Sequence, residues 1–277
     1  MTVYELVNEK VFSVFDQNVI PWKRCWQSNG GTYGNPVTKH SYRGINVILC
    51  WIHNFLFGYS SPYFVTKKQL IDMGYFIKKG AKQSLITFST RVPGKDEEGN
   101  QTPDDLHWIF RYYPVYNIED TTIPAETFAL PPLIENCTDF DFSYGYNDGP
   151  QVFYDGANPC YRPGTDTVHM PLVQDFHTLA GAQQSLFHEL THSTLKDGRV
   201  PRNFSYAKEE LVAEIGASYL MSLLGMEWDS DNSLAYIDHW RKKMSEDPKL
   251  LVIAAGKAQE AVDFIMNKGP LTLAKAV

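Results

Sequence analysis

Apolar positions in the first 120 residues alternate between a helical and a strand-like pattern. Within residues 1–20 they recur at helical spacing, which predicts an opening amphipathic helix. An apolar run over 45–57 predicts a second helix that ends at Gly58. A third, short helix is predicted over 65–74, because Thr66 can cap its start and Gly74 can end it.

Two strands are predicted to complete this half of the chain. β-Branched and aromatic residues predict a strand over 83–92 and a returning strand over 107–118. The polar, breaker-rich residues 93–105 between them predict a hairpin tip, and the Pro- and Gly-containing residues 21–36 predict a loop. This half is therefore expected to form an α+β domain over residues 1–120.

The pattern changes after residues 121–137, which contain three prolines and predict a linker. Beyond it, two segments have strand character and four have helical spacing: strands 152–155 and 166–171, and helices 176–194, 206–224, 233–244 and 249–267. The fold class is therefore predicted as α+β, with a linker over 121–139 and a mainly helical domain with a small sheet over 140–277.

Composition narrows the class of protein. The 277 residues are 43% hydrophobic and 21% charged, as in a globular protein. Four cysteines without a close pair argue against a disulfide framework and against a cysteine-rich zinc site, and they fit a reducing compartment. The N-terminus lacks a signal-peptide pattern, and the uncharged run 44–66 is broken by polar residues and GYSSP. We therefore expect a cytoplasmic protein without a membrane partner.

Charge is unevenly spread along the chain. The net charge is −7, yet residues 20–95 contain 11 lysines and arginines against one acidic residue, Asp72. Such asymmetry favours a part that faces a polyanion and a separate acidic part. On charge alone, a solvated basic surface explains the asymmetry equally well.

The sequence LFHELTHSTL, residues 186–195, contains an HExxH motif. On a helix, His188 and His192 leave the same face and can hold one metal ion. Glu189 then lies beside the open position of the metal, where it can take a proton from a bound water. The sequence has Leu195 and Gly198 where a metzincin would have its glycine and its third histidine, so the third ligand must come from elsewhere.

A carboxylate downstream can supply that third ligand. Residues 208–220 offer Glu209, Glu210 and Glu214, of which Glu210 and Glu214 share one helical face among apolar neighbours. One of these two can bind the metal while the other accepts a hydrogen bond from a ligand histidine. The alternative is an exposed acidic helix start. The combined spacing favours a zinc site with two histidines and one glutamate, although other divalent metals fit as well.

Two further features bear on a possible substrate. Tyr206 and Arg202 can donate hydrogen bonds to a tetrahedral oxyanion. Residues 166–171 can form the edge strand that lines the substrate cleft of a zincin, in which case His169 is structural and not a ligand.

The basic region interleaves cations with aromatic rings, as proteins that grip single-stranded nucleic acid do. Our candidate DNA-binding residues are Trp22, Lys23, Arg24, Trp26, Tyr42, Arg43, Lys67, Lys68, Lys78, Lys79, Lys82 and Arg91. Other rings and cations of the same region are Tyr33, Tyr63, Phe64, Phe88, Arg111, Tyr112 and Tyr113. The alternative is that most of these rings belong to the core. No helix-turn-helix, zinc-finger or RNP signature is present, which argues against sequence-specific reading of duplex DNA.

Several motifs together carry a family resemblance. Residues 35–46, 64–82 and 110–120 resemble the N-terminal domain of the ArdC family of plasmid antirestriction proteins, a domain shared with TraC-type primases. HELTHST and YAKEELVAEIGASYL (206–220) resemble the zincin-like metallopeptidase domain of the same family. The resemblance implies binding of single-stranded DNA, a metalloprotease-like domain, and cytoplasmic protection of incoming plasmid or phage DNA from restriction enzymes.

By position, the resemblance implies His188 and His192 as metal ligands, Glu189 as acid and base, and Glu210 as third ligand, with Glu214 as a rival. Leu195 replaces a glycine that many relatives have after the second histidine. Three hypotheses follow: an antirestriction protein with a working zinc peptidase, a DNA-binding protein whose zinc is purely structural, and a zinc protease that DNA recruits to DNA-bound proteins.

Overall fold

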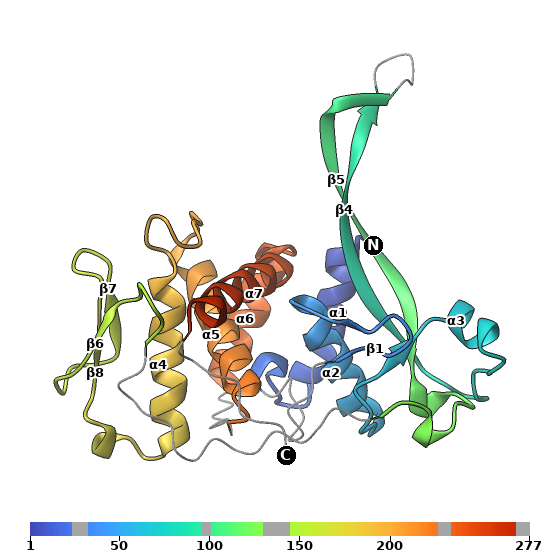
Figure 1. Ribbon diagram of the computed structural model, residues 1–277, viewed down its shortest axis with the longest axis horizontal. Helices are drawn as coiled ribbons and strands as arrows, with labels where there is room; N and C mark the ends of the chain where they lie inside the picture. Colours follow the sequence, from blue (N-terminus) through green and yellow to red (C-terminus); the bar gives the residue numbers. More distant parts are fainter. Residues whose placement is uncertain (24–32, 96–100, 130–144, 227–233, 270–277) are drawn as a thin grey trace.

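The computed structural model describes residues 1–23, 33–95, 101–129, 145–226 and 234–269 (Figure 1). It confirms the α+β class: helices dominate, and the strands form small sheets. None of the helices within these ranges combines the length and apolar character needed to cross a bilayer. The predicted DNA-binding residues Arg24 and Trp26 lie outside the described residues.

The N-terminal half begins with three helices close to those predicted. They are α1 (Val3–Phe15), α2 (Ile45–Phe57) and α3 (Lys67–Asp72), with a 3-10 turn η1 (Pro21–Lys23) after α1. Thr66 caps α3 as predicted: its hydroxyl accepts the backbone N–H of Gln69, whose side chain accepts the Thr66 N–H in return. Gly58 ends α2 in the left-handed conformation, with φ of 71°.

A long antiparallel hairpin projects from this half of the molecule (Figure 1). It pairs β4 (Gln83–Lys95) with β5 (Gln101–Asn117), and β3 (Phe64–Val65) adds to the other edge of β5. A separate short hairpin pairs β1 (Gly34–Asn35) with β2 (His40–Ser41). The strands reach further than predicted, because residues 93–95 pair with residues of the range 101–106, with a register shift between Pro93 and Gly94.

The C-terminal half packs four helices beside a three-stranded sheet. The strands are β6 (Gln151–Tyr154), β7 (Cys160–Arg162) and β8 (Thr167–Met170), and the helices are α4 (Leu179–Ser193), α5 (Tyr206–Leu223), α6 (Leu234–Glu246) and α7 (Leu250–Lys268). Three 3-10 turns lie in the connections: η2 (Ile118–Asp120), η3 (Ala125–Thr127) and η4 (Val173–Asp175).

The sheet order corrects one prediction. It runs β6-β8-β7, so β8, within the predicted strand 166–171, is the inner strand and not the edge. The unpredicted strand β7 forms one edge of the sheet, and β6 forms the other. The pairing of β7 with β8 explains why a three-residue segment without a clear alternating pattern becomes a strand at all.

Residues from both sides of the predicted linker share one hydrophobic core, which extends from Val7 to Ile265. Trp22 packs edge-on against Trp240 of α6, with 6.3 Å between ring centroids. The Tyr219 hydroxyl of α5 donates to the Gly44 carbonyl at 2.8 Å, just before α2. The two halves are therefore joined by buried contacts as well as by the chain.

Helices α4 and α5 approach each other closely at Gly216. A Cβ at this position would lie 2.5 Å from Cγ2 and 2.7 Å from Oγ1 of Thr191. Because both branches of this stiff side chain are in the way, rotating Thr191 does not relieve the overlap. The close approach matters for function, since it sets how far the side chains of α5 reach toward α4.

Substituting Gly216 tests this packing. Gly216→Ala is expected to destabilise the protein by about 1 to 3 kcal/mol, because overpacking outweighs the gain in helix propensity. The matched control is Gly256→Ala, at an exposed position of α7 where an added Cβ meets nothing within 4 Å. The control should be neutral or slightly stabilising in denaturant unfolding. Equal effects of the two changes would contradict the close approach.

Candidate metal centre

Helix α4 presents the HExxH motif to a cleft in the C-terminal half. The Thr178 hydroxyl caps the start of α4 by accepting the Gly181 N–H at 3.0 Å. His188, Glu189 and His192 all line the cleft, which has a volume of about 590 Å³. Glu189 itself is largely buried, whereas both histidine rings are partly open to solvent. The motif therefore lies where a substrate can reach it.

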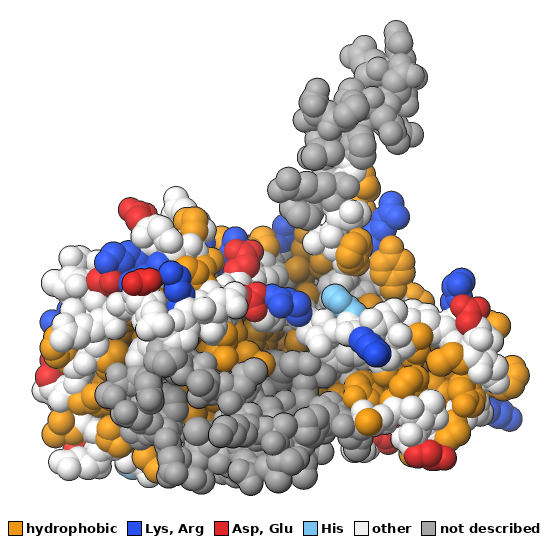
Figure 2. Space-filling view, viewed as in Figure 1, with side chains coloured by type: hydrophobic (Ala, Val, Ile, Leu, Met, Phe, Trp, Pro, Cys, Tyr) orange, Lys and Arg blue, Asp and Glu red, His pale blue; other side chains and the backbone are white. Residues whose placement is uncertain are grey.

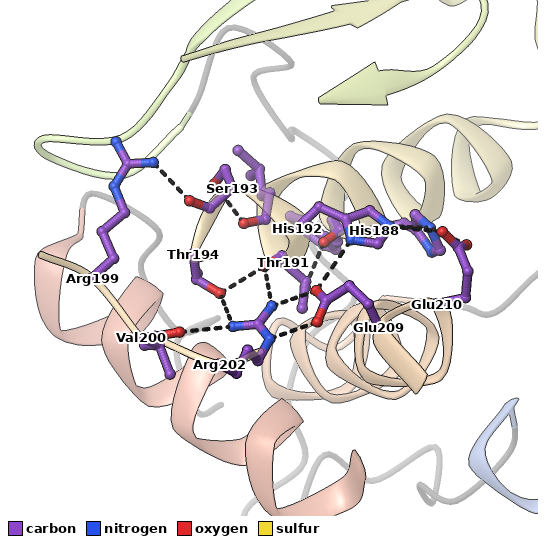
Figure 3. Close-up of polar contacts among 12 residues, drawn as sticks. His188, Thr191, His192, Ser193, Thr194, Arg199, Val200, Arg202, Glu209 and Glu210 are labelled. Atoms are coloured by element: carbon purple, nitrogen blue, oxygen red, sulfur yellow. Dashed lines mark hydrogen bonds and ion pairs between the residues drawn. The ribbon is translucent and has the colours of Figure 1, made fainter. Parts of the chain in front are cut away.

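Helix α5 brings Glu210 to the two histidines (Figure 3). Glu210 Oε2 lies 3.4 Å from His188 Nε2, and Glu210 Oε1 lies 3.5 Å from His192 Nε2. The two Nε2 atoms are 3.1 Å apart. One ligand atom from each residue lies within 4.8 Å of the others, the only group of this kind found among the described residues. Two imidazole nitrogens and one carboxylate oxygen form a donor set that fits a divalent metal.

Of the two other glutamates of α5, Glu214 does not take the predicted role, and Glu209, for which no role was predicted, contacts a ligand histidine. Glu214 lies one turn beyond Glu210 and is not part of the ligand group. It lines a smaller cavity of about 170 Å³, together with His188 and Glu189. Glu209, which adjoins Glu210, accepts a hydrogen bond from His192 Nδ1 at 3.2 Å. The partner of the ligand histidine is thus Glu209 and not Glu214.

Spacing alone could not have found Glu209, because residues 209 and 210 do not share a helical face. Both reach the site because the first turn of α5 lies against the end of α4, so that adjacent residues flank one histidine ring. The signal was nevertheless present: an acidic pair at a helix start, 17 residues after His192, with apolar neighbours.

Arg202 corrects a further prediction. Its side chain is only 1% exposed, and it binds both carboxylate oxygens of Glu209 (Figure 3). A guanidinium in this position cannot donate to an oxyanion in the cleft. Tyr206, in contrast, is 80% exposed at the first position of α5 and lines the cleft. The negative charge of Glu210 raises the pKa of the Tyr206 hydroxyl, which keeps it a donor.

Edge strand β7 forms part of the opposite wall of the cleft. Cys160 and Tyr161 of β7 line it, together with Pro163. The turn after β7 is tied to the end of α4, since Arg199 binds both Asp166 and the Ser193 carbonyl. His169 of β8 bonds Asp155 through Nδ1 at 2.6 Å, so it lies in a surface pair and serves as a structural residue.

Hydrogen bonds and charge join the histidines and glutamates of the site to one another. Hydrogen bonds from His188 and His192 keep the pKa of Glu210 well below its usual range. Burial of His192 works against its protonation, but hydrogen bonds to Glu209 and Glu210 outweigh burial and raise the pKa of His192 to about 9. His192 is therefore protonated at neutral pH when no metal is bound.

Metal binding should consequently release a proton. His192 must lose its Nε2 proton to bind a metal, so we expect about one proton released per metal at about pH 7.5. Release should fall by about half near pH 9 and vanish well above it, where His192 is neutral, and affinity should fall as the pH is lowered. Calorimetric titration in two buffers of different ionisation enthalpy measures this number. No proton release at neutral pH would contradict the raised pKa.

The predicted DNA-binding residues divide into a buried and an exposed group. Trp22 is 0% exposed, and Tyr42 and Lys23 are also buried. The Lys23 ammonium lies 4.6 Å from the centroid of the Tyr236 ring, inside the protein. The prediction that these three residues contact DNA is wrong, because their side chains are buried inside the protein. Arg43 is partly exposed but pairs with Asp263 of α7.

The exposed group lies around α3 and the hairpin. The lysines predicted from the sequence that lie on the surface are Lys67, Lys68, Lys78, Lys79 and Lys82. Lys68 pairs with Asp72 in an exposed ion pair. The side chain of Arg91 lies outside the described residues. Exposed rings occur further along, at Phe88, Tyr112 and Tyr113 of the hairpin.

Comparison with known proteins matches each half of the chain to a known domain. Residues 1–116 match the model of the N-terminal domain of anti-restriction factor ArdC, and residues 146–257 match that of a zincin-like metallopeptidase. Crystal structures of antirestriction protein ArdC from plasmid R388, metal-free and Mn(II)-bound, superpose with a TM-score of 0.75 at 27% and 28% identity. Each comparison covers 96% of this chain and 97% of the ArdC chain.

Similar sequences occur in two further proteins. Uncharacterized protein y4eC of Sinorhizobium fredii (strain NBRC 101917 / NGR234) is 25% identical over 95% of this chain and 91% of its own length. DNA primase TraC of Escherichia coli is 27% identical over 95% of this chain, which spans only 27% of the primase. Matched domains in the same order, and a likeness in fold over nearly the whole length, show that the chain belongs to the ArdC antirestriction family, with an N-terminal ArdC domain followed by a zincin-like metallopeptidase domain.

Proposed function

We propose that this protein is an antirestriction factor that binds single-stranded DNA through its N-terminal half and holds zinc at a peptidase site in its C-terminal half. In this proposal it acts in the cytoplasm on incoming plasmid or phage DNA, and its peptidase substrate is a protein that acts on that DNA. The observation that carries the peptidase half is the convergence of His188, His192 and Glu210 on one point of an accessible cleft beside Glu189.

The donor set favours zinc among divalent metals. Two imidazoles and one carboxylate are a common zinc triad, although Mn(II), present in one ArdC crystal structure, also accepts such ligands. A structural zinc site is closed by four protein ligands, whereas the described residues here supply three, at a cleft open to solvent. The arrangement therefore favours a catalytic metal over a structural one.

Each residue of the cleft then has a distinct task. A bound zinc would supply Lewis-acid chemistry, that is, polarisation of a substrate carbonyl and a lowered pKa for a water molecule. Glu189 is placed to accept a proton and to pass it to the leaving amine, since it lines the same cleft as the two histidines. Tyr206 is placed to donate a hydrogen bond to the oxygen that gains negative charge. Edge strand β7 offers backbone groups to an extended peptide.

The hairpin supplies the surface that favours DNA binding. Phe88 pairs directly across from Arg111, and Ile86 across from Tyr113, so these four side chains share one face. Phe88 is 55% and Tyr113 is 44% exposed, and Arg111 is exposed beside them. Figure 2 shows hydrophobic and basic side chains together on the described part of this arm. Rings for stacking beside cations for phosphates are what single strands require.

A pair of substitutions tests the hairpin surface. Phe88→Ala and Tyr113→Ala should each weaken binding of an oligothymidylate by about 1 to 3 kcal/mol, because each ring can stack on one base. The matched control is Phe153→Ala, a partly exposed ring of β6 in the C-terminal half, which should bind like the parent protein. Fluorescence anisotropy at two salt concentrations measures both affinity and its salt dependence. Binding that does not weaken with salt, or full affinity of both hairpin variants, would sink the proposal.

A further inference from the structure

Arg202 makes an unusually complete set of hydrogen bonds next to the metal centre. Its Nε donates to Glu209 Oε2 at 2.8 Å, and one terminal nitrogen donates to Glu209 Oε1 at 2.7 Å. The remaining donors reach Thr191 O at 3.1 Å, Thr194 Oγ1 at 2.8 Å and Val200 O at 3.3 Å (Figure 3). A guanidinium has five N–H groups, and five bonds are made here.

This arrangement fixes Glu209 in one position. Both of its carboxylate oxygens are bound by the planar fork of Arg202, so the carboxylate cannot rotate without breaking a bidentate pair. Glu209 Oε1 also accepts from His192 Nδ1 at 3.2 Å. With Nδ1 engaged as a donor, His192 has only Nε2 left for a metal, and Nε2 is the atom that faces His188 and Glu210.

The same guanidinium joins two helices. Thr191 and Thr194 belong to the end of α4, which carries His192, whereas Glu209 belongs to the first turn of α5, which carries Glu210. Arg202 therefore ties together the two helix ends whose spacing decides whether the ligand atoms converge. A lysine cannot replace it, because an ammonium is a point donor without the planar fork.

We propose that Arg202 is a positioning residue of the metal centre, which acts through Glu209 to hold His192 with Nε2 directed at the metal. This inference rests on the proposed metal site. It assigns a metal-directed role to a buried ion pair that lies outside the ligand set.

The proposal is tested with Arg202→Lys and Glu209→Gln, both of which keep a polar group in place. Each should weaken zinc binding about 10-fold or more, the usual effect of losing the outer partner of a ligand histidine. Zinc affinity is measured by competition with a chelating dye, and folding of the metal-free variants by circular dichroism. The matched control is Arg199→Lys, another buried arginine, which binds Asp166 and the Ser193 carbonyl but not Glu209.

A double variant that combines Arg202→Lys with Glu209→Gln shows whether the two residues support zinc binding together or independently. If Arg202 acts through Glu209, the double variant loses no more zinc affinity than the weaker-binding single variant. Parent-like zinc affinity in both single variants, additive losses in the double variant, or an equal loss in Arg199→Lys would overturn the proposal. If Arg202→Lys does not fold, the zinc affinity of Glu209→Gln, compared with that of Arg199→Lys, still tests the proposal. If even the parent protein binds no zinc, the metal site itself fails.

Discussion

Alanine at position 210 is expected to remove zinc from the protein, whereas alanine at position 214 is expected to leave it bound. Glu210 contributes one of three ligand atoms that lie within 4.8 Å of one another. Losing an outer partner of a ligand typically costs 10- to 100-fold in affinity, so losing a ligand itself should cost more than about 100-fold. Elemental analysis and dye competition measure the effect in Glu210→Ala and Glu214→Ala.

Glu214 is a demanding control, because it also lies on α5 and lines a cavity with His188 and Glu189. A general loss of acidic charge near the site would affect both variants alike. Stoichiometric zinc in Glu210→Ala would refute the assigned ligand. Loss of zinc from Glu214→Ala, with zinc kept in Glu210→Ala, would show that Glu214 is the third metal ligand.

The second large effect is expected for Glu189→Gln. This change keeps the size of the side chain and leaves His188, His192 and Glu210 in place, so zinc and fold should be retained. Hydrolysis should fall by about 10²- to 10⁴-fold, the contribution of a positioned general acid and base. The assay uses casein as an unfolded protein substrate, with and without single-stranded DNA, and elemental analysis confirms the metal.

Glu189→Gln also distinguishes the three hypotheses for the family role. Parent protein and Glu189→Gln are compared in an assay that transfers unmodified plasmid DNA into a restricting recipient. The assay measures how well each protein protects the incoming DNA. Loss of protection in the variant supports a peptidase mechanism. If protection is unchanged, DNA binding protects the incoming DNA and hydrolysis does not. Hydrolysis at the parent rate by Glu189→Gln would show that this residue is not the acid and base.

The features that could be predicted from the sequence depend on residues a few positions apart, such as helix ends, caps and helix faces. Helix α2 has both predicted ends, because its apolar run is long and Gly58 takes the left-handed conformation that stops it. The HExxH histidines share a face because helix geometry alone places residues four apart there. The cap at Thr66 follows from a threonine and a glutamine three positions apart.

The features that were not predicted correctly depend on how helices and strands pack against one another. Glu209, rather than Glu214, supports His192 because α5 crosses α4 closely at Gly216 and Thr191, and no spacing rule contains that crossing. Trp22 and Tyr42 are surrounded by basic residues in the sequence, yet they fill the core shared by the two halves. Aromatic and basic composition looks the same for a ring in the core and for one on a DNA-binding surface.

The central claim is that one divalent metal is held by His188, His192 and Glu210. Anomalous diffraction from crystals grown with zinc, recorded on both sides of the zinc absorption edge, tests it most directly. We predict a single strong peak in the cleft, about 2.0 to 2.2 Å from His188 Nε2, His192 Nε2 and a carboxylate oxygen of Glu210. No peak between these residues, or a peak bound by Glu214 in place of Glu210, would contradict the claim.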